Sequence, residues 1–209
     1  MNTRRRFLGL SAALALGRRA PAQVIEFESG GLRYQTLTRN GVTIMFAHLS
    51  LHIRDYAVLQ TAISNGSSRS WTFKPQDFRF SRSDGPEIPG QEARRVVDEF
   101  MKHGGRDDVI KLVTTYESGL YGMQQVKSTN GYEMRRQSVI AEMTNTRWKA
   151  AAAASAIVLV PVRLKPGEST DGAVFFTTGG KPLANGKLQI EAGGSVFEFE
   201  TGAVHESKP

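Results

Sequence analysis

The residues with the clearest capacity for recognition chemistry lie between positions 132 and 148. Tyr132, Arg135, Arg136, Arg147 and Trp148 combine aromatic rings with guanidinium groups. Such side chains often anchor protein–protein interfaces, because they bury large areas and donate several hydrogen bonds. We therefore name these five residues as a candidate interaction surface. Packing of a helical segment against a core, with its arginines on the wet side, would explain the same residues.

Histidines and paired carboxylates could instead bind a metal ion or transfer protons. His48 and His52 are four residues apart, a spacing that leaves two side chains roughly 13 Å apart on a strand. The surrounding residues favour strand and loop, so we expect surface histidines rather than a metal site. Asp107 and Asp108 could form an acid–base pair, but a place at the start of a helix explains both.

Familiar catalytic motifs are missing from the sequence. The glycine-rich segments 179–181 and 193–195 lack the rest of a phosphate-binding loop, and no G-x-S-x-G nucleophile motif occurs. The chain has no cysteine, which removes thiol catalysis, cysteine zinc sites and iron–sulfur clusters. We expect no catalytic residue, no bound metal and no cofactor.

Most of the chain has the alternating pattern of strands. Apolar and polar residues alternate in Leu32–Thr38 and Val42–Ala47, on either side of the hairpin signal Asn40-Gly41. Similar short runs fill residues 24–82 and 157–199. Several strands separated by short turns predict a β-sandwich.

The neighbouring phenylalanines Phe175 and Phe176 belong to a predicted strand, Ala173–Phe176. Successive side chains of a strand point to opposite faces. One ring is therefore expected inside the sandwich and the other beneath the helices. The apolar, β-branched run Ile157–Val160 is also predicted as a strand.

The pattern changes to a helical one at about 91–155. Apolar residues recur every three or four positions over 93–101 and 109–120, which predicts two helices. Asn130 can cap a third helix, and Ala150–Ala154 has high helix propensity. Because strands on both sides are needed to complete one core, we interpret these helices as an insertion; two separate domains are the alternative.

The first 22 residues have the composition of an export signal. Thr3-Arg4-Arg5-Arg6-Phe7-Leu8 precedes a short apolar run, Phe7–Leu16, and resembles the twin-arginine export signal. Ala20-Pro21-Ala22 supplies a cleavage pattern, with Gln23 as the first mature residue. The apolar run is shorter than the roughly 20 residues that span a bilayer. An arginine-rich general-secretion signal is the alternative.

Removal of this signal changes the charge balance. The full chain has 27 Lys and Arg against 20 Asp and Glu, a net charge of +7, but five of the arginines precede Gln23. The mature chain would keep 22 basic and 20 acidic residues, a net charge of +2. This balance does not indicate nucleic-acid binding. We expect no nucleic-acid partner, and membrane contact only during export.

Two segments resemble units of bacterial secreted immunoglobulin-like β-sandwich domains, a family of unknown function. The first is Ala62–Ser67 with Phe73, Pro75, Phe78 and Asp84-Gly85; the second is Leu164–Glu168 with Gly172–Phe176. The resemblance covers 23–88 and 157–201. It implies a sandwich fold for these parts and no catalytic residues.

These observations together predict a mainly-β, immunoglobulin-like sandwich over 23–209, carrying about three inserted helices. The expected function is an exported, non-catalytic binding or assembly module of the bacterial periplasm or cell envelope, with an envelope protein as partner. The alternatives are a small extracytoplasmic hydrolase and a carrier of an apolar ligand. The hydrolase would use a pocket between helices and sheet, with His103, Glu133 and Arg136 clustered there.

Overall fold

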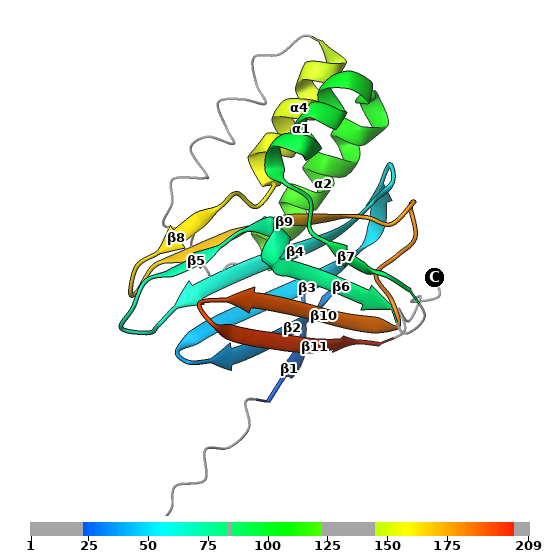
Figure 1. Ribbon diagram of the computed structural model, residues 1–209. Coiled ribbons are helices and arrows are strands. Elements are labelled where there is room, and N and C mark those ends of the chain that lie inside the picture. Colours follow the sequence, from blue (N-terminus) through cyan, green and yellow to red (C-terminus); the bar gives the residue numbers. More distant parts are fainter. Residues whose placement is uncertain (1–22, 83–84, 123–144, 203–209) are drawn as a thin grey trace, which may run out of the picture.

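The computed structural model describes residues 23–82, 85–122 and 145–202 (Figure 1). It confirms the predicted fold class, a mainly-β, immunoglobulin-like sandwich with inserted helices. Two antiparallel sheets form the sandwich, and the helices stand together at one end of the molecule (Figure 1).

The larger sheet has five strands in the order β1-β2-β3-β4-β9. They are β1 (Ile25–Ser29), β2 (Leu32–Arg39), β3 (Val42–Ile53), β4 (Tyr56–Asn65) and β9 (Ser169–Thr177). The first four follow one another along the chain, and β9 joins after the helical insertion. This order places the insertion beside β4 and β9.

The smaller sheet has four strands in the order β11-β10-β6-β7. They are β6 (Phe78–Arg82), β7 (Glu87–Pro89), β10 (Gly186–Ala192) and β11 (Ser195–Thr201). A separate short pair joins β5 (Trp71–Phe73) to β8 (Val162–Leu164), and the 3₁₀ helix η1 (Pro75–Asp77) leads into β6.

The tight turns form where the sequence predicts them. Asn40 and Gly41 both have positive φ angles, of 52° and 77°, as a two-residue hairpin turn requires. Gly193 and Gly194 repeat this arrangement between β10 and β11. These turns set the register that directs apolar side chains into the core.

The main core lies between the two sheets and is rich in aromatic rings. Phe46 of β3 and Phe199 of β11 meet edge to face with centroids 4.8 Å apart. Phe176, Trp71 and Phe73 belong to the same buried cluster. Because no cysteine is present, this packing must hold the two sheets together.

Three described helices cover the outer face of the larger sheet near β4 and β9 (Figure 1). They are α1 (Ala93–His103), α2 (Arg106–Gly122) and α4 (Thr146–Ile157). Phe175 packs here against Tyr56 and Phe100, with ring centroids 5.6 Å and 6.4 Å away. The prediction that Phe175 and Phe176 serve opposite faces is therefore confirmed.

One strand prediction is wrong. Ile157 is the last residue of α4 rather than the first of a strand. Val158 makes an isolated parallel bridge to Ala173, and its amide caps α4 by donating to the carbonyl of Ala154. The run is apolar because both helix and sheet bury it. The helix predicted from Asn130 lies outside the described residues.

Among the described helices, none is both long enough and apolar enough to cross a bilayer.

Candidate functional site

The first turn of α4 presents the two candidate interface residues that the structure describes. Asn145 caps this helix, and its side-chain oxygen accepts the backbone N–H of Arg147 at 2.9 Å. Arg147 is exposed, and Trp148 has 55% of its surface accessible to solvent. Tyr132, Arg135 and Arg136 lie outside the described residues.

The rest of α4 explains why Trp148 stays in solvent. The residues after Lys149, Ala150–Ala154, are all buried, and all but Ala152 belong to the core cluster between the helices and the sheet. These small side chains let the helices approach closely, so the core at this contact leaves no space for a large ring. Packing into the core therefore does not account for Trp148.

Another large apolar side chain is exposed close to the same helix contact. A Cβ atom at Gly104, just after α1, would lie 2.6 Å from the Cβ atom of Ala150, so these helix ends touch. Met101, one turn before Gly104, is 40% exposed. An exposed apolar residue thus occurs within three positions of the contact on each helix.

A pocket of ≈ 440 Å³ opens where the β3–β4 turn meets the junction of α1 and α2. Its lining is polar and mostly basic: His52, Arg54, His103, Gly105, Arg106, Asp107, Asp108 and Lys111. The hydrolase alternative places His103 in such a pocket, whereas its expected companions Glu133 and Arg136 lie outside the described residues.

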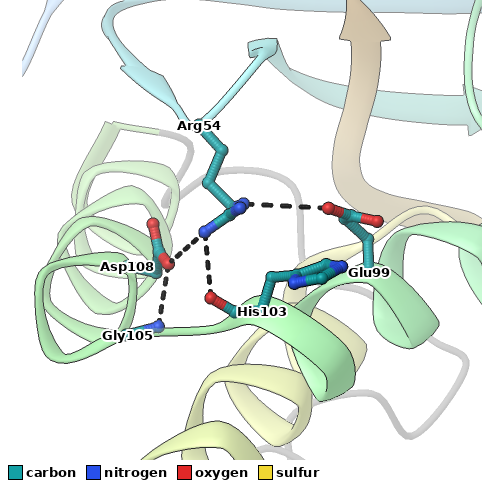
Figure 2. Close-up of polar contacts among 5 residues, drawn as sticks. All are labelled: Arg54, Glu99, His103, Gly105 and Asp108. Carbon is teal, nitrogen blue, oxygen red and sulfur yellow. Dashed lines mark hydrogen bonds and ion pairs between the residues drawn. The ribbon is translucent and has the colours of Figure 1, made fainter.

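Arg54 organises this junction (Figure 2). Its Nη1 donates to the carbonyl oxygen of His103 at 2.9 Å and lies 3.4 Å from Oδ2 of Asp108. Its Nε lies 3.9 Å from a carboxylate oxygen of Glu99. The backbone of Arg54 has a φ of 57°, which costs energy for a residue with a side chain. These contacts fix the β3–β4 turn to the ends of α1 and α2.

Asp108 has the helix-start role that the sequence predicts. Its Oδ2 accepts the backbone N–H of Gly105 at 2.9 Å, just before α2 begins. The same oxygen faces Arg54, and only 8% of the residue is exposed. Asp107 is exposed in the first helical turn. The two carboxylates therefore differ in surroundings, and Asp108 is committed to capping and to Arg54.

The charges in the pocket favour a small anion or an acidic side chain. Arg54 is balanced by Asp108 and Glu99, whereas Arg106 and Lys111 have Asp107 as the remaining acidic neighbour in the lining. His52 also lines the pocket and is exposed. No cluster of three potential metal ligands occurs within the described parts of the chain.

The space beneath the helices is packed rather than open in the described part of the molecule. Tyr56, Phe100 and Phe175 fill it together with the alanines of α4. A smaller pocket of ≈ 200 Å³ lies at its edge, lined in part by Arg95, Glu99 and Tyr56. Burial raises the pKa of the Tyr56 hydroxyl, and the nearby Glu99 carboxylate raises it further.

Arg54 has no local signature in the sequence that marks it as a functional residue. A lone arginine in a turn has no spacing that distinguishes it from other surface arginines. One sequence signal could have found it: Arg54 and Asp55 form a two-residue connection between the alternating runs of β3 and β4. Such short hairpin connections require a left-handed backbone. Even so, its partners lie 45 to 54 positions away, and the sequence does not reveal them.

Comparisons with known proteins provide no family. No protein-family model matches the chain, and no curated protein matches its sequence. The crystal structure of the yjhA protein from Bacillus subtilis aligns with 79% of this chain and 76% of its own, at 8% identity and a TM-score of 0.31. That likeness is too slight to bear on fold or function.

Proposed function

We propose that the protein is an exported, non-catalytic binding or assembly module of the bacterial periplasm or cell envelope. The observation that carries the proposal is the exposure of Trp148 beside Arg147, on a helix whose other face is buried. Tryptophan and arginine are among the residue types most enriched as energetic anchors of interfaces.

The ring of Trp148 offers a partner a large apolar surface that is still in contact with water. A tryptophan can bury on the order of 150–250 Å² in an interface, and burial of apolar area contributes about 25 cal/mol per Å². More than half of Trp148 is available for such burial. Asn145 orders the first turn of α4, which lowers the entropy cost of presenting this ring to a partner.

The predicted signal at residues 1–22 supports the extracytoplasmic location. Replacement of Arg4 and Arg5 by lysine tests the twin-arginine route, because that pathway reads the arginine pair. The R4K/R5K variant should accumulate as an uncleaved cytoplasmic precursor, while the native chain appears outside the cytoplasm with Gln23 at its N-terminus. A native chain that fractionates with the cytoplasm would refute the location.

The interaction proposal is tested by quantitative co-purification from envelope extracts after in-cell cross-linking. Trp148→Ala, alone and with Arg147→Ala, should lose the dominant partner. Ile110→Ala is the matched control, because Ile110 of α2 is 56% exposed. If the W148A/R147A variant had a native circular dichroism spectrum and still retained the partner, Trp148 would not be part of the interface.

A second candidate function is binding of a small anionic ligand at the Arg54 junction. The pocket and its basic lining favour this function. A thermal-shift panel of phosphate, sulfate and dicarboxylates tests it with the native chain and an R106A/K111A variant. Stabilisation by one anion that the variant loses would support the ligand site, and no stabilisation in the panel would argue against it.

A further inference from the structure

The outermost strand of the larger sheet, β1, has an edge that can accept another strand. Among the strands of the described residues, β1 pairs with β2 alone, from Ile25 opposite Thr36 to Ser29 opposite Leu32. Four of its five residues are exposed. Figure 1 shows β1 at the end of the molecule opposite the helices. In the described part of the chain no strand pairs with the outer edge of β1, whose backbone donors and acceptors can pair with another chain.

Two other strand edges of the sandwich already have contacts. At β11, the guanidinium of Arg39 donates to the carbonyl of Val196, and Gln35 Nε2 donates to that of Glu200 at 3.0 Å. At β9, the carbonyl of Ala173 accepts from the amide of Leu159 at 2.8 Å.

The hydrogen bonds that the described residues make with β1 come from β2. One of these is a side-chain hydrogen bond, in which Gln35 Nε2 donates to the carboxylate of Glu26. The outer edge of β1 therefore differs from the edges of β9 and β11, which carry contacts from other segments of the chain.

The side chains of β1 define what kind of strand would fit. Ile25 and Phe27 lie on one face and are 60% and 39% exposed. Phe27 stacks on Tyr34 with ring centroids 5.3 Å apart, so this apolar face is ordered. Glu26 and Glu28 lie on the other face and are exposed. Opposite charges directly across two strands stabilise their pairing, and like charges destabilise it.

This charge pattern argues against a second copy of the chain as the occupant. Two β1 strands paired antiparallel about Phe27 would place Glu26 of each copy opposite Glu28 of the other. A strand with basic residues in register with these glutamates, and apolar residues between them, avoids that repulsion and covers Ile25 and Phe27.

We propose that β1 is a docking edge for an extended segment of another protein in which basic and apolar residues alternate. The segment would add a sixth strand to the sheet, with main-chain hydrogen bonds providing affinity and the glutamates providing selectivity. This docking edge is independent of the Trp148 surface, which lies on α4.

The test uses the full chain and a synthetic seven-residue probe peptide that alternates lysine with valine or phenylalanine. Fluorescence anisotropy measures its binding to the native chain, to an E26K/E28K variant and to an E198K/E200K control. The control reverses two exposed charges on β11, whose edge is already contacted. Matched probes carry glutamate instead of lysine, or N-methylated amides on one edge.

The lysine probe should bind the native chain and the control equally, and the E26K/E28K variant about tenfold more weakly, because two cross-strand pairs become repulsive. The glutamate probe should prefer E26K/E28K, and N-methylation should abolish binding. Amide exchange at residues 25–29 should slow when the lysine probe binds.

Three results would overturn the proposal. The first is equal binding of the lysine probe to the native and E26K/E28K chains. The second is the absence of protection in β1 at saturating probe. The third is a concentration-dependent dimer that Phe27→Lys dissociates, which would assign this edge to a second copy of the chain.

Discussion

Asn65 shows how a single buried side chain joins distant parts of the sandwich. Its Nδ2 donates to the carbonyl oxygens of Arg69 at 2.8 Å and Leu164 at 3.0 Å, and its Oδ1 accepts the amide of Ser67 at 3.0 Å. Asn65→Ala would remove all three of these hydrogen bonds. We expect the free energy of unfolding to fall by about 3 kcal/mol, measured by urea denaturation.

Asn145→Ala is the comparison for this prediction. Among the described residues, Asn145 makes one capping bond, to the amide of Arg147, and it is exposed, so its loss should cost about 1 kcal/mol. Equal losses for the two variants would show that burial of the Asn65 network contributes nothing extra.

Arg54 is the second residue whose contacts can be tested directly. Arg54→Ala removes its hydrogen bond to the carbonyl of His103 and its ion pairs with Asp108 and Glu99. Because the side chain is 33% exposed, solvent screens these pairs and the expected loss is about 1 kcal/mol. Hydrogen exchange should accelerate around residues 103–108, while exchange in β10 stays unchanged; acceleration in both regions would contradict a local role.

At the residue scale, the sequence predicts turn residues better than their distant partners. Asn40-Gly41 is recognisable as a hairpin turn because these residue types tolerate the positive φ angles that both adopt. The bond from Asn65 to Leu164 spans 99 positions and leaves no local signal. The sequence predicts Asp108 at a helix start, whereas its pairing with Arg54 depends on how the sheet and helices meet.

At the scale of elements, the contact of α1 with α4 depends on Gly104. A Cβ atom there would lie 2.4 Å from the carbonyl oxygen of Phe100 and 2.6 Å from the Cβ atom of Ala150. Gly104→Ala should therefore separate the two helices and lower the free energy of unfolding by about 2 kcal/mol. Hydrogen exchange should accelerate in α1 and α4 before it does in the sandwich.

Gly105 provides the control at the neighbouring position. A Cβ atom at Gly105 would lie 3.7 Å from Oδ2 of Asp108, an ordinary van der Waals contact, so Gly105→Ala should be tolerated. If G104A and G105A had the same stability, close helix packing at this contact would not be limiting.

At the scale of elements, hydrophobic periodicity predicts most of the helices and strands correctly but fails at one run. Alternation locates the strands of both sheets, and the alanine run predicts α4. The strand prediction for Ile157–Val160 is wrong because two surfaces bury this run: a helix ends there and the chain passes directly to the sheet. Continuous burial produces the same apolar run in either structure.

At the scale of the whole molecule, stability should fall in alkaline solution. Burial raises the pKa of both Tyr34 and Tyr56 above the ordinary value of 10.0. The unfolded chain therefore loses these protons first, so their contribution is complete below about pH 10 and is lost as pH rises through the folded-state pKa values. Urea titrations from about pH 8 to about pH 11.5 should show this decline.

A Y34F/Y56F variant distinguishes the contribution of these two residues to the pH dependence of stability from that of the other tyrosines. Its unfolding free energy should depend less on pH in alkaline solution. Within the described part of the chain, the buried Tyr34 hydroxyl has no hydrogen-bond partner, so Tyr34→Phe alone should be neutral or slightly stabilising at neutral pH. An unchanged alkaline slope in the double variant would contradict the assignment.

The two proposed contact surfaces lie on elements at opposite ends of the molecule (Figure 1). Trp148 and Arg147 belong to the helical end, and β1 forms the other. If both proposals hold, the sandwich keeps the two binding surfaces apart, so that each could contact a different partner.

The most direct test of the binding function places a photo-cross-linking amino acid at position 146 of the full chain in living cells, with position 94 as the control. Thr146 is exposed in the first turn of α4 beside Arg147 and Trp148, and Arg94 is on α1 with a side chain that is 91% exposed. We expect one dominant envelope protein cross-linked from position 146, lost on Trp148→Ala, and no such product from position 94. No adduct from position 146, or the same adducts from both positions, would contradict the proposed interaction surface.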